Sequence, residues 1–113
     1  MPASELADTS AAIVMVLQGH LTRSSLLTVF ADAGPQIDRA ACERCLIVDC
    51  LTMTGYDPDA RSEFVRWVRE RKPLLRCVAI VTDKVLWRMV VGAMGLASQV
   101  PTQAFDTRDQ AEA

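Results

Sequence analysis

Residues 45–51 read Cys-Leu-Ile-Val-Asp-Cys-Leu and residues 76–81 read Arg-Cys-Val-Ala-Ile-Val, two short apolar runs rich in β-branched residues. Runs of this length with little polar alternation are typical of strands buried on both faces, as in parallel sheets. A third run of the same kind spans residues 11–18 and ends at Gly19. The sequence therefore predicts three buried strands, and parallel strands need helices or long crossovers between them.

Two helical patterns lie between these strands. Residues 25–33 form the first, with Thr22 or Ser24 as its cap and the Gly34-Pro35 pair as its end. The second begins at Asp57 and Pro58, an N-cap followed by a residue suited to the first helical position. Four of its apolar residues share one face, at i, i+4, i+7 and i+8: Ala60, Phe64, Trp67 and Val68. Residues 37–43 fit either a further helical turn or a loop.

The C-terminal part of the chain continues the alternation. Thr82 or Asp83 offers a cap for a helix over residues 84–97, residues 103–105 form a short edge strand, and Thr107 begins a final helix through residue 112. The order β-α-β-α-β-α-β-α predicts an α/β fold with a four-stranded, mostly parallel sheet and alternating helices. We expect one domain over residues 11–113, preceded by a flexible tail of residues 1–10.

The composition excludes several classes of function. The 113 residues suffice for one domain, and 12 Lys and Arg against 14 Asp and Glu give a formal charge of −2, which argues against a nucleic-acid binder. The N-terminus carries two acids in its first eight residues and lacks the basic region of a signal peptide. The apolar run near it is too short for a transmembrane segment. We therefore expect a cytoplasmic protein.

The four cysteines lie at positions 42, 45, 50 and 77, mostly inside or beside apolar runs. The Cys42-Glu43-Arg44-Cys45 spacing precedes a strand, whereas a thioredoxin-like pair follows one and opens a helix. A zinc site would have to recruit Cys50 and Cys77, which are predicted strand residues. We interpret all four as reduced structural thiols that behave as small apolar side chains.

Candidates for catalysis and metal binding are few. His20 is the only histidine, and no neighbouring nucleophile completes a triad. Asp49, Asp57 and Asp83 could together hold a hard cation at the edge of the sheet, but helix capping already accounts for two of them. We expect neither an enzyme nor a metal site, and no cofactor.

The helix over residues 84–97 has two apolar faces. One face carries Leu86, Met89, Val90, Ala93 and Leu96, and we expect it to pack against the sheet. The other carries Trp87, Val91 and Met94 beside Lys84 and Arg88. The C-terminal segment, a second copy of the chain, another protein or lipid could cover this second face, and partner surfaces are enriched in Trp and Met.

The order of several short phrases resembles the STAS domain, the family of anti-sigma factor antagonists and SpoIIAA-like proteins. These phrases lie near the predicted strands and in the C-terminal part of the chain: Gly19-His20-Leu21-Thr22, Leu46-Ile47-Val48-Asp49, the turn at residues 53–57, Gly92-Ala93-Met94-Gly95-Leu96 and residues 103–107 with Ala111. The resemblance covers residues 11–113. It implies a small bacterial cytoplasmic module that binds a protein partner, such as an anti-sigma factor or a serine kinase.

The chain departs from this family at its phosphorylation motif. The family has an aspartate, two serines, a glycine and a leucine where this chain has Asp57-Pro58-Asp59-Ala60-Arg61. Pro58 has no hydroxyl, and the carboxylate of Asp59 supplies less charge than a phosphate would. Ser62 is the remaining hydroxyl on that helix. The interpretation without regulatory meaning is a plain Asp-Pro helix start.

Together these observations predict a non-catalytic protein-interaction module, with a possible homodimer among its assemblies. The predicted partner-binding surface comprises Tyr56, Asp57, Asp59, Arg61, Ser62, Trp87, Arg88, Val91 and Met94. The alternative is a domain that encloses a small apolar ligand or lipid, by analogy with lipid carriers of similar fold.

Overall fold

Four strands and three α-helices alternate along the chain in the computed structural model, which describes residues 12–39, 44–107 and 111. The elements are β1 (Ile13–Leu21), α2 (Arg23–Asp38), β2 (Arg44–Tyr56), α3 (Pro58–Glu70), the short 3-10 helix η1 (Lys72–Leu74), β3 (Leu75–Val81), α4 (Val85–Ser98) and β4 (Thr102–Phe105). The strands form one sheet in the order β1-β2-β3-β4, and every pair is parallel. The predicted α/β class and the parallel sheet are confirmed.

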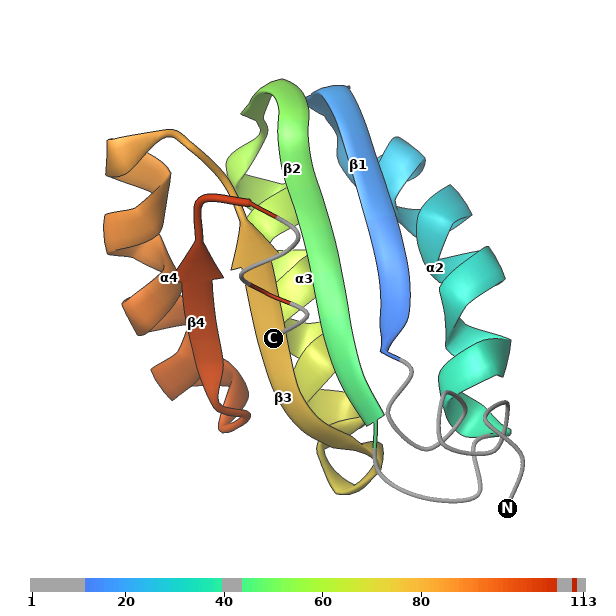
Figure 1. Cartoon of the computed structure of the whole chain (residues 1–113). Helices are drawn as coiled ribbons and strands as arrows, with labels where there is room; N and C mark the ends of the chain where they lie inside the picture. Colours follow the sequence, from blue (N-terminus) through green and yellow to red (C-terminus); the bar gives the residue numbers. More distant parts are fainter. Residues whose placement is uncertain (1–11, 40–43, 108–110, 112–113) are drawn as a thin grey trace, which may run out of the picture.

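The strand order decides where the helices lie. Each strand pairs with the next one along the chain, and crossovers between parallel strands are right-handed in nearly all proteins. Successive crossovers that advance in the same direction must therefore lie on the same face, and α2, α3 and α4 do so (Figure 1). The opposite face receives no crossover helix.

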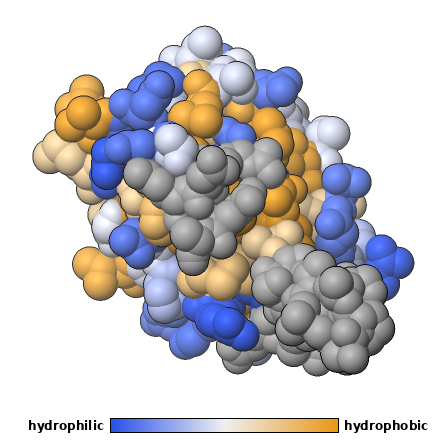
Figure 2. Space-filling model, viewed as in Figure 1, coloured by the Kyte–Doolittle hydropathy of each residue, from blue (hydrophilic) through white to orange (hydrophobic). Residues whose placement is uncertain are grey.

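The main core fills the space between the sheet and the three helices. Alternate residues of the strands point into it, and Leu26, Ile37, Leu46 and Ala60 are fully enclosed. The other face of the sheet carries a smaller cluster of Ile47, Ala79 and Val81, against which Phe105 and Ala111 pack. Figure 2 shows that hydrophobic residues gather on this face over β1 and β2.

The first two strands run further than their apolar patterns predict. Gly19 was expected to end the first strand, but it adopts a left-handed φ of 64° and β1 continues to Leu21. Glycine tolerates this conformation because it has no Cβ, and the register shifts there as at a β-bulge. The second strand continues through residues 53–56, which the family resemblance assigned to a turn. These extensions bring Leu21 opposite Tyr56.

The helix α2 does not end at the Gly34-Pro35 pair, and that prediction is wrong. Thr22 caps its start as expected, with a capping box to Ser25, and the helix passes through Pro35 to Asp38. A proline inside a helix costs about 3 kcal/mol. Ile37, in the turn after the proline, is completely buried, which is worth about 1.5–3 kcal/mol and offsets much of that cost. Of residues 37–43, the first two thus complete the helix, while 40–43 lie outside the described residues.

Two of the four cysteines are not the reduced thiols that we expected. Cys45 and Cys77 are register partners on β2 and β3, their Cα atoms lie 4.8 Å apart, and they form a disulfide. Neighbouring strands of a sheet are this close everywhere, but the sequence did not show which cysteines would face each other. Cys50 is a buried free thiol, as predicted, and Cys42 lies outside the described residues.

The remaining elements agree with the sequence. The helix α3 buries the predicted face, and the Trp67 and Phe30 rings stack with their centroids 4.2 Å apart. β3, α4 and β4 differ from their predicted bounds by one residue at most. Of the predicted final helix, the structure describes Ala111, which is helical and donates to the Thr107 carbonyl; the predicted tail of residues 1–10 lies outside the described residues. In the described part of the chain, no helix is long and apolar enough to span a bilayer.

Candidate interaction surface

The helix α4 faces the sheet with the side opposite to the one we predicted. Val91 is 4% exposed, and Trp87 and Met94 pack against the main core. Trp87 meets the ring of Tyr56 edge to face, with centroids 5.5 Å apart, and the Lys84 ammonium lies 4.5 Å above its ring. The helical period reveals two apolar faces, but the aromatic partner on β2 decides which one turns inward.

The outward face of α4 is therefore a row of large apolar side chains. Val85, Leu86, Met89 and Leu96 are 70%, 74%, 74% and 84% exposed. Hydrophobic side chains project along the edge of the molecule where α4 lies (Figures 1 and 2). Single exposed apolar residues are common, whereas these four share one helix and form a continuous apolar row.

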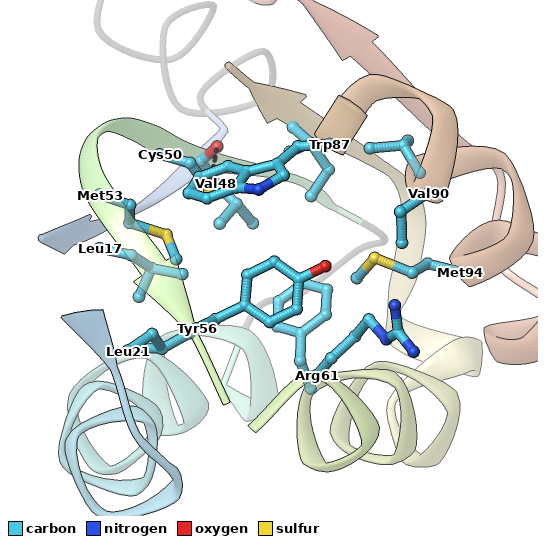
Figure 3. Close-up of a pocket in the computed structure, with 13 residues that line it drawn as sticks. Leu17, Leu21, Val48, Cys50, Met53, Tyr56, Arg61, Trp87, Val90 and Met94 are labelled. Atoms are coloured by element: carbon cyan, nitrogen blue, oxygen red, sulfur yellow. Dashed lines mark hydrogen bonds between the residues drawn. The ribbon is translucent and has the colours of Figure 1, made fainter. Parts of the chain in front are cut away.

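A small apolar pocket lies beneath α4, at the carboxyl ends of the strands (Figure 3). Its volume is about 70 Å³, and its walls come from β1, β2, β3, α3 and α4. Tyr56 and Met94 point toward the middle of the pocket, and Trp87 closes one side. Arg61 is the one charged residue among the lining residues that the structure describes.

The polar groups around this pocket are held by the protein itself. Lys84 Nζ donates to the Met53 carbonyl at 2.8 Å, which fixes the cation above Trp87. Burial raises the pKa of the Cys50 thiol to about 12; the Asp49 carboxylate adds to this shift and Lys84 opposes it. The thiol is thus protonated at neutral pH and behaves as an apolar wall rather than as a nucleophile.

A broader groove runs between α3 and α4 and adjoins the pocket. It measures about 540 Å³, and the pocket and the groove share Arg61, Val90 and Met94 in their walls. The α3 wall carries Arg61, Arg66 and Arg69, and the α4 wall carries Met89, Val90, Ala93, Met94 and Ala97. The groove therefore has one basic and one apolar side.

The start of α3 has the expected backbone but an unexpected side-chain partner. Asp57 is the N-cap residue, yet its carboxylate caps no backbone N–H. Instead its Oδ1 lies 2.7 Å from His20 Nε2 at the end of β1. Asp59 is exposed in the first turn, where the helix dipole favours an acid.

The structure brings together six of the nine predicted surface residues. Tyr56, Arg61, Trp87, Val91 and Met94 line the pocket, and Ser62 lines the groove with Arg61. Val91 is buried, so it supports the surface from within and offers no contact area. Arg88 points elsewhere and pairs with Asp106 after β4. Asp57 and Asp59 line neither cavity.

Sequence reasoning missed the residues that now dominate the surface. Leu86, Met89 and Leu96 were expected to face the sheet, and Arg66 and Arg69 were not among the predicted surface residues. The three arginines at positions 61, 66 and 69 all line the groove. Their spacing along α3 would have indicated a basic groove wall if the sequence had shown that α4 is the neighbour of α3. Among the described residues, no three His, Cys, Asp or Glu side chains gather as metal ligands.

Comparison with known proteins identifies the fold. The chain is similar to the crystal structure of an uncharacterized protein of the DUF3478 family from Shewanella loihica PV-4, which has a SpoIIAA-like fold. The TM-score is 0.71 at 12% sequence identity, and the match covers 87% of this chain and 79% of that one. No family model and no curated protein matches the chain. The chain thus has the SpoIIAA-like fold, in agreement with the resemblance of its sequence.

Proposed function

We propose that this chain is a non-catalytic regulatory module of a bacterial cytoplasmic pathway, which acts by binding a protein partner. The observation that carries the proposal is the row of Val85, Leu86, Met89 and Leu96, each at least 70% exposed on one face of α4. Exposing this much apolar surface is unfavourable unless a partner removes it from water. An anti-sigma factor or a serine kinase is the class of partner that the family resemblance suggests.

The module has one fixed state at the position of the family's phosphorylation switch. Pro58 occupies the first position of α3 and has no hydroxyl, while Asp59 keeps a negative charge in the same turn. Ser62 is exposed one turn further along and lines the groove. In this proposal, partner binding depends on the amount of each protein rather than on phosphorylation at this site.

The size of the pocket favours a protein partner over the alternative, a bound lipid or other apolar ligand. Its volume of about 70 Å³ is roughly half of the ~150 Å³ of an engineered cavity that admits benzene. An acyl chain would not fit inside this pocket unless α4 moved away from the sheet. Native mass spectrometry of the purified protein measures this alternative directly, since an enclosed ligand adds its mass to the chain.

The test is an affinity capture from host lysate with the wild type and three variants. Leu86→Glu and Met89→Glu place a charge on the exposed face of α4, and Leu27→Glu places one on an exposed position of α2 as a matched control. We expect the wild type and Leu27→Glu to retain the same partner and the two α4 variants to lose it. Circular dichroism first establishes that each variant is folded.

Three results would count against the proposal. Equal capture of the partner by all four proteins would remove α4 from the interface. If nothing is captured, and light scattering shows a dimer that Leu86→Glu dissociates, the face joins two copies of the chain instead. A co-purified ligand in the native mass spectrum would favour the alternative function.

A further inference from the structure

The pocket and the groove form one continuous recess. Both are lined by Arg61, Val90 and Met94, and the apolar row of α4 continues from the groove through Met89. The recess lies between α3 and α4, which contact each other. A groove between two helices can accept the apolar face of an amphipathic helix.

The pocket is the size of one aliphatic side chain. At about 70 Å³ it holds less than benzene requires, and its walls are apolar apart from the groups at its mouth. This mouth is where the pocket meets the groove, at the lining residues that both share: Arg61, Val90 and Met94. Small apolar pockets at the centre of an interface are where a partner's anchoring side chain gains most of its binding energy.

The positive charges of the groove favour an occupant with negative charge. Arg61, Arg66 and Arg69 line the α3 side, and no acidic residue is among the described lining residues. Arg66 is engaged by Glu63, whereas Arg61 and Arg69 form no ion pair in the part of the chain that the structure describes. These two arginines are eight residues apart, which corresponds to about 12 Å along a helix.

We propose that the partner binds through an amphipathic acidic helix laid in this groove, an inference that rests on the interaction function proposed above. One aliphatic side chain of the helix enters the pocket, and two carboxylates about two turns apart pair with Arg61 and Arg69. A second copy of α4 does not meet this requirement, because Val85–Ser98 contains no acidic residue. An anionic membrane would match the charge but not the concave groove.

The experiment uses the purified chain as bait for a display library of random peptides of about 15 residues, enough for four helical turns. Enriched peptides are synthesised with a fluorescent label and titrated by anisotropy against the wild type and its variants. Arg61→Glu reverses the charge at the mouth of the pocket. Arg76→Glu makes the same change on β3, where the arginine is exposed and lines neither cavity.

We expect enriched peptides to be acidic, with aliphatic residues at helical spacing, and to become helical on binding. Arg61→Glu should weaken them at least tenfold and Arg76→Glu less than twofold, while Ala in place of the anchoring aliphatic residue should also weaken binding tenfold. Peptides that lose binding with Leu86→Glu but not with Arg61→Glu would overturn this inference and leave the interaction function standing. Failure to enrich any peptide, or binding of the chain to anionic vesicles with the same sensitivity to Arg61→Glu, would also overturn it.

Discussion

His20 and Asp57 join the end of β1 to the start of α3, with His20 Nε2 and Asp57 Oδ1 2.7 Å apart. The imidazole lies against Gly55, where a Cβ would come within 3.0 Å of Nδ1. The pair is half exposed, at 55% and 46%, so solvent screens it. The pair lies next to Tyr56, the residue of β2 that lines the pocket.

The first prediction concerns this pair. His20→Ala and Asp57→Ala should each lower the free energy of unfolding, and their coupling in a double-mutant cycle should be about 0.2–1 kcal/mol, because a half-exposed polar contact gains little. Urea titrations of the four proteins measure the cycle. A coupling of zero would mean that the contact adds no stability to the strand end.

The second prediction tests the orientation of α4. Val91→Ala removes two buried methyl groups and should cost about 2 kcal/mol, whereas Leu86→Ala on the exposed face should change the stability by less than about 0.5 kcal/mol. Both changes shorten an aliphatic side chain on the same helix, so each serves as the control for the other. A larger loss of stability for Leu86→Ala than for Val91→Ala would mean that the face with Leu86 packs against the sheet, as the sequence predicted.

The third prediction concerns the thiol in the pocket wall. Because burial raises the pKa of Cys50 to about 12, iodoacetamide at pH 8 should alkylate it at least tenfold more slowly in the folded protein than in guanidinium. The folded pKa lies above the ordinary value of 9.0, so the unfolded state ionises first and this site lowers stability as the pH rises above 9. Peptide mapping of the alkylated protein follows Cys50 alone. Equal alkylation in the two states would show that the thiol is accessible.

The fourth prediction concerns Cys45 and Cys77. Their disulfide spans a sequence separation of 32, and closing a loop of that length stabilises a protein by about 2–4 kcal/mol. Dithiothreitol should therefore lower the melting temperature of the wild type and leave that of the Cys45→Ser, Cys77→Ser double variant unchanged. Non-reducing peptide mapping checks the bond itself. A melting temperature insensitive to the reductant would contradict the stabilising role.

The fifth prediction concerns the proline inside α2. Pro35→Ala restores a backbone N–H and a helix-compatible residue, which should raise stability by about 1–2 kcal/mol after the greater flexibility of the unfolded chain is counted. Thermal unfolding measures the gain. Gln36→Ala, at the next and exposed position of the helix, controls for helix propensity alone. A loss of stability would mean that the helix is shaped around the proline.

The fold could be predicted from the sequence because the patterns that indicate its strands and helices are local. The continuous apolar strands and the Asp57-Pro58 helix start depend on neighbouring residues only, and these elements are where the patterns predicted them. The errors arose where tertiary packing decides the local structure. The contact between Tyr56 and Trp87 places one face of α4 against the core. Burial of Ile37 stabilises α2 beyond Pro35, and the register of β2 and β3 places Cys45 opposite Cys77.

The candidate site was predictable only in part, for the same reason. The sequence placed Tyr56, Arg61 and Met94 on the predicted surface, and the structure gathers them at one pocket. The groove required knowing that α3 and α4 are neighbours, which follows from the strand order and not from either helix. The structure was therefore needed to show that Arg69 and Met89 line this groove.

The strand order also allows the sheet to assemble step by step while the chain is being synthesised. Since every strand pairs with the one that precedes it in the chain, each new strand finds its partner already made as it leaves the ribosome. Assembly can then proceed from the N-terminus by adding one helix and one strand at a time. The helix α4 and β4 join last, so a nascent chain that stops before them would display β3 as an unpaired edge and lack the proposed binding face.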